Sequence, residues 1–302
     1  MINNKIYINL LSQFEKLFKH NRQGSFRTKH RYAEAYKRFL VFLAEVYRLE
    51  KIANVAPKHV YAYVDKLIQS GKSIAYAKTE LSAVRFWHDK LSNPRHKHLP
   101  SNKDLNLAKR KYGGVDRTWS QREFNLAVVR ASALGREDYV TVLCLARYAA
   151  LRLHECFRID VQTAAVALKT GKLQIKGKGG LEREVPINLS IEIQLEKTLS
   201  VTPRGHKLFV QPDDKTHLAM HRFQNFISRY KADIQDPGST RPLHFHGLRH
   251  TRAAEWYEEF LEQGTLEKQA RLEVARLLGH NRDCVTRIYL ASLQKDGDVD
   301  GC

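Results

Sequence analysis

The stretch 172–187, KLQIKGKGGLEREVPI, is the part of the sequence that decides the fold. Residues 172–176 and 183–187 alternate apolar and polar positions, which is the pattern of a strand with one buried face. The glycine-rich turn Gly177-Lys178-Gly179-Gly180 separates them. We therefore predict a two-stranded antiparallel hairpin. The sequence on both sides has helical spacing, so the predicted fold is mainly α with a small antiparallel β-sheet.

Helical patterns surround the hairpin. Ser120-Gln-Arg-Glu123 is a capping box, and it opens a helical stretch that we expect to run to about Ile159. Within this stretch, one helical pattern ends and another begins at residues 149–155. Gly279 is expected to cap the carboxyl end of the last of the later helices. Those later helices are expected at 189–199, 216–232, 246–263 and 267–278.

The amino-terminal part reads as a small bundle of about four helices. Apolar residues recur at helical spacing, and Pro57, Gly71 and Ser73 provide start and stop signals. The bundle carries an aromatic stripe, which we expect to lie in the core instead of serving as a platform on which bases stack. The expected helices are 5–19, 28–49, 58–70 and 73–91.

Charge is distributed unevenly along the chain. The net charge is +19; residues 1–112 hold 23 Lys and Arg against 8 Asp and Glu, a net of +15, and the remainder holds 28 against 24, a net of +4. This excess favours nucleic acid as the counter-charge over an anionic membrane. The residues expected to contact DNA are Lys29, Arg38, Lys78, Arg85, Arg95, Lys97, Lys109, Arg110 and Lys111.

Residues 93–118 differ from their surroundings in composition. They contain two prolines, paired glycines and seven basic residues with little periodicity, which predicts a linker. The linker would either follow the phosphate backbone or be a solvated tether. It divides the chain into a helical domain, residues 1–92, and a second domain, residues 119–302.

The composition argues against secretion and membrane insertion. No run of 18 apolar residues occurs, and the amino terminus lacks the pattern of a secretion signal. The four cysteines have no CxxC spacing, and we expect Cys144 and Cys156 to be buried thiols. These features fit a reducing cytoplasm.

Two familiar motifs can be excluded. Ser70-Gly71-Lys72-Ser73 resembles the end of a P-loop, but Lys66 stands where the first glycine is required, so no nucleotide site is expected. His154-Glu155 begins like a metalloprotease motif, but Arg158 replaces the second histidine. The fourteen histidines show no convincing ligand spacing, so neither metal nor cofactor is expected.

A set of basic and hydrogen-bonding residues remains. Arginines can neutralise phosphoryl oxygens, histidines can donate hydrogen bonds or move protons, and a tyrosine can form a covalent bond. Such a combination suits a phosphodiester. The candidate residues are Arg152, Glu155, Lys178, His246, Arg249, His280 and Tyr289.

Together these residues resemble the tyrosine recombinase (phage integrase) family. That family has an arginine in a G-L-R-x-x-E segment, a lysine in a G-K-G turn, H-x-L-R-H, L-G-H, and a tyrosine nine residues later. The same elements occur here in the same order over about residues 120–290. The amino-terminal bundle is similar to the family's core-binding domain by pattern alone. The matching residues are Arg152 with Glu155, Lys178, His246 with Arg249, His280, and Tyr289.

The resemblance implies a mechanism. Tyr289 would attack the scissile phosphate and form a 3′-phosphotyrosyl link, and Lys178 would protonate the leaving 5′-oxygen. Arg152 and Arg249 would hold the non-bridging oxygens. The histidines, His246 and His280, would assist by hydrogen bonding and proton transfer. Glu155 would orient a neighbour. Specific recombination sites, a dimer or tetramer on DNA, and accessory proteins are the implied partners.

The sequence departs from the family pattern in three places. Ala149-Ala150 replaces the usual small residue and glycine, and residues 258–273 are expected to be an insertion. Only 13 residues follow Tyr289 and they are polar, so the mode of subunit assembly stays open.

Three other functions make different demands on the sequence. A type IB topoisomerase shares the chemistry but rejoins the same strand. A non-catalytic basic DNA-binding protein would not need a tyrosine beside two arginines. A metal-dependent transposase would need three positioned carboxylates, and the acidic residues here form no such set.

Overall fold

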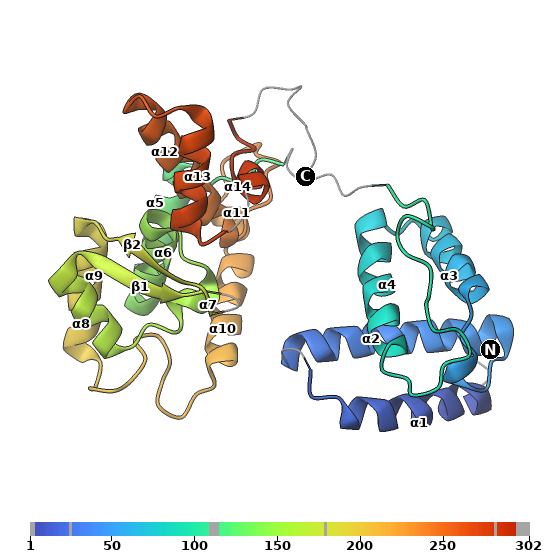
Figure 1. The fold of residues 1–302 in the computed structure, drawn as a ribbon. Helices are drawn as coiled ribbons and strands as arrows, with labels where there is room; N and C mark the ends of the chain where they lie inside the picture. The colour runs from blue at the N-terminus through green and yellow to red at the C-terminus, as the bar shows by residue number, and fades with distance from the viewer. Residues whose placement is uncertain (1–3, 24–25, 109–114, 178–179, 281–282, 294–302) are drawn as a thin grey trace. The chain divides into compact units, whose positions relative to one another are not determined.

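The computed structural model describes residues 4–23, 26–108, 115–177, 180–280 and 283–293. The chain divides into two compact units, Met1–Lys111 (unit 1) and Tyr112–Cys302 (unit 2), which are drawn in Figure 1. The described residues of unit 1 are helical, and those of unit 2 are helical around one two-stranded sheet. The prediction of a mainly α fold with a small antiparallel sheet is therefore confirmed.

Unit 1 contains the expected bundle. Pro57 stands at the first position of α3, and Ser73 caps α4 because its Oγ accepts a hydrogen bond from the Tyr76 amide at 3.1 Å. A π-helical turn, Leu43–Tyr47, extends α2. The helices are α1 (Asn4–His20), α2 (Phe26–Phe42), α3 (Pro57–Gln69) and α4 (Ile74–His88).

The aromatic stripe of unit 1 forms its core. Trp87, Tyr36 and Phe39 have no exposed surface. The Phe14 ring lies edge-on to Trp87 with 5.0 Å between centroids, a favoured aromatic geometry. The prediction that these rings are core residues is confirmed.

The first part of the predicted linker, residues 93–108, belongs to unit 1 and packs against its helices. Its leucines bury apolar surface against α3 and α4, and Arg85 Nε donates to the Pro100 carbonyl at 2.8 Å. The expectation of an unpacked linker is therefore wrong for residues 93–108. It rested on the prolines and charges of this segment and left out its apolar positions. Those positions are Leu99, Leu105 and Leu107.

Unit 2 surrounds its hairpin with helices. Ser120 and Glu123 form the capping box that was predicted for α5. Neither α8 nor α14 was predicted. The helices are α5 (Gln121–Ala133), α6 (Glu137–Ala149), α7 (Leu153–Cys156), α8 (Val161–Thr170), α9 (Leu189–Val201), α10 (Thr216–Arg229), α11 (Lys231–Ile234), α12 (His246–Glu262), α13 (Glu267–Leu278) and α14 (Asp283–Tyr289).

The helical stretch predicted from Ser120 to Ile159 is interrupted twice. Gly135 adopts φ +66° after α5, and Ala150 adopts φ +50° after α6. A left-handed conformation costs an alanine about 1–2 kcal/mol, and the spacing of apolar residues does not reveal it. The helix junction predicted within residues 149–155 is therefore confirmed, whereas the break at Gly135 was not predicted. The break at Ala150 frees the segment that carries Arg152.

The hairpin has the predicted pairing. β1 (Lys172–Lys176) lies antiparallel to β2 (Glu182–Pro186), with Ile175 opposite Arg183. Both strands alternate exposed and buried positions. Arg183 occupies one of the inward positions of β2, where an apolar residue would be expected.

Candidate active site

Four separate segments of unit 2 bring the predicted site residues together. Arg152 caps α7, His246 and Arg249 lie in the first turn of α12, His280 follows the Gly279 cap of α13, and Tyr289 ends α14. Tyr289 Oη lies 3.1 Å from His246 Nε2. His280 Nε2 lies 2.9 Å from Arg152 Nη2 and 3.5 Å from Arg249 Nη2.

Arg249 is a fully buried cation. One guanidinium nitrogen donates to the Ala150 carbonyl and another to the Leu278 carbonyl at 2.5 Å. Its Nε has no hydrogen-bond partner among the described residues. Its guanidinium carbon lies 5.5 Å from the centre of the Tyr289 ring. Two peptide carbonyls therefore fix the charge beside the tyrosine, and one donor is left unused.

Glu155 is a buried carboxylate shared by arginines. It accepts hydrogen bonds from Arg152 Nη1 at 2.9 Å and from the Arg152 amide at 2.8 Å, and it lies 3.9 Å from Arg249 Nη1. Burial alone would raise the pKa of Glu155, but the hydrogen bonds and charge of Arg183, with the Arg152 amide and Arg249, lower it to about 2. Glu155 is ionised at neutral pH and holds Arg152 in place.

Three imidazole rings surround Tyr289. The His250 ring stacks on the Tyr289 ring with 4.4 Å between centroids, and the rings of His246 and His280 lie at 5.5 Å and 5.0 Å. Burial and then the charges of Arg249 and Arg152 lower the pKa of His246 to about 4 and that of His280 to about 3. Both rings are neutral at pH 7, so each has one unprotonated nitrogen that can accept a hydrogen bond.

Two residues of this site were missed by the sequence reasoning. His250 was quoted within the motif but was given no role, and its stacking on Tyr289 depends on tertiary structure. Arg183 was treated as a strand residue. The signal that would have found Arg183 is a charged residue at an inward position of a predicted strand.

Lys178 lies outside the described residues. The turn that precedes it is described, and the Gly177 amide donates to the Leu181 carbonyl at 2.7 Å. A Cβ at Gly177 would lie 3.7 Å from Glu155 Oε1. The turn that carries Lys178 therefore begins beside the carboxylate of the site.

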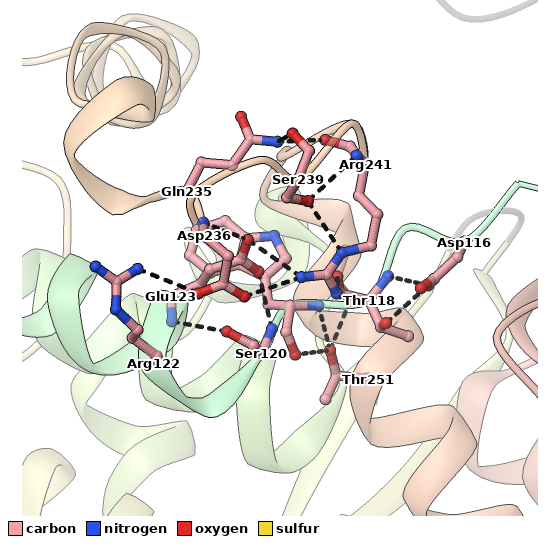
Figure 2. A network of polar contacts seen from close by, with 12 residues as sticks. Asp116, Thr118, Ser120, Arg122, Glu123, Gln235, Asp236, Ser239, Arg241 and Thr251 are labelled. Carbon is pink, nitrogen blue, oxygen red and sulfur yellow. Dashed lines mark hydrogen bonds and ion pairs between the residues drawn. The ribbon is translucent and has the colours of Figure 1, made fainter.

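The segment that leads into α5 is held against α12 by a polar network (Figure 2). Arg241 Nη1 donates to the Thr118 carbonyl at 2.8 Å, and Arg241 Nη2 lies 3.3 Å from Glu123 Oε1. Thr251 Oγ1 accepts from the Trp119 amide at 2.8 Å. A Cβ on Gly247 would approach the Arg117 carbonyl to 2.2 Å. This network therefore fixes the turn of α12 that carries His246 and Arg249.

The residues expected to contact DNA fall into three groups. Arg95 and Lys97 are exposed. Lys109, Arg110 and Lys111 lie outside the described residues. The other four have partners within unit 1: Lys29 donates to the Asn21 carbonyl, Arg38 pairs with the buried Glu80, Lys78 donates to the Ala108 carbonyl, and Arg85 donates to Pro100 and Asn102.

The described part of the chain has neither a metal-binding cluster nor a membrane-spanning helix. No group of three or more His, Cys, Asp or Glu side chains there could hold a metal ion. None of its helices is both long and apolar enough to cross a membrane. Cys144 and Cys156 are buried free thiols, as predicted.

The assembled groups define the class of the site. Two fixed guanidinium groups can bind the oxygens of a phosphate, and a phenol with a neutral imidazole at hydrogen-bond distance can act as a nucleophile toward it. The model of the phage integrase family matches residues 126–296, more than half of the chain. The chain therefore belongs to the phage integrase family. The model of the phage integrase N-terminal SAM-like domain matches residues 11–92.

Individual relatives agree with this assignment. Tyrosine recombinase XerC of Natranaerobius thermophilus is 25% identical over 260 residues, which cover 82% of each chain. A lambda integrase dimer bound to a COC′ core site matches with a TM-score of 0.64 and 16% identity, covering 96% of this chain and 79% of that chain. The XerH recombinase in a post-cleavage complex with difH matches with a TM-score of 0.62 and 19% identity, covering 92% and 80%. These structures show the shared fold.

Proposed function

We propose that this protein is a site-specific DNA recombinase that cleaves and rejoins strands through a 3′-phosphotyrosyl intermediate. The observation that carries the proposal is the 3.1 Å contact between Tyr289 Oη and His246 Nε2, beside the guanidinium groups of Arg152 and Arg249. Nucleophile, proton acceptor and charge stabilisation are thus contributed by one chain. Membership of the phage integrase family supports the same reaction.

In the first step Tyr289 Oη attacks the scissile phosphorus. The Oη–P bond forms, the bond between phosphorus and the 5′-oxygen breaks, and the phenolic proton passes to His246. Arg152 and Arg249 bind the non-bridging oxygens, where negative charge increases in the transition state. His280 Nε2 accepts from the guanidinium groups of Arg152 and Arg249, and in this proposal it assists by holding both against the same phosphoryl group.

Lys178 completes the step by donating a proton to the leaving 5′-oxygen. The 5′-hydroxyl of a partner strand then attacks the phosphotyrosine and gives its proton to the deprotonated Lys178. The Oη–P bond breaks, and Tyr289 recovers its proton from His246. The energy of the phosphodiester bond is kept in the covalent link, so no nucleotide hydrolysis is required. Glu155 positions Arg152 throughout.

The two units have different tasks in this proposal. Residues 1–92, within unit 1, form the core-binding domain, which binds the duplex, and residues 119–302, within unit 2, form the catalytic domain. The partner is double-stranded DNA with specific recombination sites, on which the enzyme acts as a dimer or tetramer with accessory proteins. An enzyme that acts on such DNA would be found in the cytoplasm with the nucleoid.

The competing function is that of a type IB topoisomerase. Both enzymes would form the same covalent adduct, but a topoisomerase relaxes supercoiled DNA without a recognition site. A recombinase joins strands only between paired specific sites. Relaxation of a plasmid that lacks such sites would favour the topoisomerase.

The decisive test is the Tyr289→Phe variant. Removing the phenolic oxygen should abolish covalent capture of DNA and leave binding within about twofold, because the hydroxyl does chemistry and does not anchor the duplex. A denaturing gel resolves the covalent protein–DNA complex, and Tyr257→Phe is a matched control on α12. An adduct that persists in Tyr289→Phe would refute the assignment.

A further inference from the structure

Arg183 is buried on the inward face of β2, and each nitrogen of its guanidinium group donates a hydrogen bond. Nη1 and Nη2 donate to the two carboxylate oxygens of Glu155 at 3.1 Å and 2.8 Å. Nε donates to the Leu277 carbonyl at 2.9 Å. The side chain is 5% exposed, so burial keeps this arginine from direct contact with DNA.

Arg183 also touches the backbone beside three predicted catalytic residues. A Cβ built on Gly279, the residue before His280, would lie 3.0 Å from Arg183 Cδ. A Cβ on Gly177, the residue before Lys178, would lie 3.4 Å from Arg183 Nη1. Glu155, which Arg183 binds, orients Arg152. One side chain therefore contacts the segments that carry Arg152, Lys178 and His280.

The charges around Glu155 require such a partner. Glu155 is fully buried, and the guanidinium groups of Arg152, Arg183 and Arg249 all lie within 4 Å of it. A buried carboxylate needs a hydrogen-bonded counter-charge. The bidentate pair with Arg183 supplies that charge, and bidentate pairing is the strongest geometry available to a carboxylate.

We propose that Arg183 is a positioning residue for strand cleavage: by neutralising Glu155, it leaves the charges of Arg152 and Arg249 available to the phosphate. Without Arg183, Glu155 would draw both arginines toward itself and weaken the electric field at the phosphorus. The proposal rests on the proposed recombinase function, since it assigns Arg183 to the same site.

The test compares single-turnover cleavage of a DNA duplex by the full chain and by variants. Arg183→Gln should slow formation of the covalent adduct by about 10²-fold, as expected when catalytic groups are displaced by about 1 Å, while DNA binding changes by less than about threefold. The double variant Arg183→Gln/Glu155→Gln should recover at least tenfold of that loss. The recovery is specific to a charge role, because a purely structural role would make the double variant as slow as the single variant or slower.

Two further variants keep the test decisive. Arg183→Lys retains the charge and should stay within about tenfold of the unmodified protein, and it serves if Arg183→Gln does not fold. Glu184→Gln changes an exposed carboxylate of the same strand and should have no effect. Thermal melting checks the folding of each variant.

The results separate this inference from the proposed function. If the unmodified protein forms no adduct through Tyr289, the recombinase function fails. If it forms the adduct, three results would overturn the role of Arg183: full activity of a folded Arg183→Gln, no recovery in the double variant, or loss of activity in a folded Arg183→Lys by about 10²-fold.

Discussion

Arg249 carries a charge in a place from which water is excluded. Burial lowers its pKa to about 10, so the guanidinium stays protonated at neutral pH. The carbonyls of Ala150 and Leu278 and the face of the Tyr289 ring compensate for the lost hydration. Such a charge is already oriented before the phosphate arrives, and a fixed charge in a dry site stabilises a transition state more than a solvated one. The strain at Ala150 helps to place the carbonyl that Arg249 uses.

Lys178 is the general acid of the proposed mechanism. Lys178→Ala should slow cleavage by about 10²–10⁴-fold, because the 5′-oxygen would leave without a proton. A substrate with sulfur at the bridging 5′ position has a leaving group that needs no proton. That substrate should restore cleavage by Lys178→Ala but not by Arg152→Ala or Arg249→Ala, whose function is charge stabilisation. Adduct formation on both substrates measures the effect.

Lys176 is the matched control for Lys178. It ends β1 and forms an exposed pair with Glu182 at 3.6 Å, so Lys176→Ala should cleave normally. Rescue of Lys176→Ala by the sulfur substrate would move the acid to that residue. If neither lysine variant is rescued, the proton comes from His246 or His280.

The sequence predicted the site residues whose signal is local, but not their partners. Arg152, His246, Arg249, His280 and Tyr289 stand in short motifs with fixed spacing, and the structure brings them together. The partners of Arg183 lie 28 and 94 positions away in sequence, on α7 and at the end of α13. No local pattern encodes such contacts.

At the scale of secondary-structure elements, close packing holds the first turn of α12 in place. Gly247 lies against the Arg117 carbonyl and the Trp119 ring, where an added Cβ would approach atoms at 2.2 Å and 2.6 Å. Trp119 is fixed from both sides, because its amide donates to Thr251 Oγ1 and its Nε1 donates to the His244 carbonyl. Room for a methyl group would require one of these contacts to break.

We predict that Gly247→Ala destabilises unit 2 by about 1–3 kcal/mol, as overpacking usually does. Each kcal/mol should lower the melting temperature of a domain of this size by about 2–4 °C. A loss of stability would be informative, because Gly→Ala inside an unstrained helix normally stabilises the protein. Cleavage should fall as well, since His246 and Arg249 flank the displaced backbone.

The control for this prediction is Glu258→Ala, an exposed position on the same helix. Thermal denaturation should show almost no change for that variant. A rise in the melting temperature of Gly247→Ala would mean that the contact with Arg117 and Trp119 relaxes without cost.

Element ends were predicted well where a side chain or glycine marks them. Ser73, the Ser120–Glu123 box and Gly279 mark helix ends as expected. The helix junction within residues 149–155 was predicted, but the left-handed conformation of Ala150 was not, because an alanine gives no sequence signal for it. The short helix α14 was missed because two turns carry too little apolar periodicity.

At the scale of the whole molecule, the chain has two units that differ in net charge. Unit 1 carries nearly all of the excess positive charge, 23 Lys and Arg against 8 Asp and Glu, whereas unit 2 is almost balanced. The described basic residues of unit 1 are not equivalent. Arg38 and Arg85 bind partners within the unit, while Arg95 and Lys97 are exposed on the segment that packs against it.

The salt dependence of DNA binding can distinguish the exposed basic residues of unit 1 from those that have partners within it. Each phosphate contact that is lost should lower the log–log slope of affinity against salt by about 0.9. Unit 2 has its own core, so a protein that begins at Tyr112 can be compared with the full chain, and its slope should be clearly flatter.

In the full chain, Arg95→Ala with Lys97→Ala should lower the slope by about 1.8, and Lys169→Ala on α8 is the control. Arg38→Ala should instead lower the melting temperature, because it leaves the buried Glu80 without its ion-pair partner. An unchanged slope in the shortened protein would mean that the charge of unit 1 serves solubility and not DNA binding.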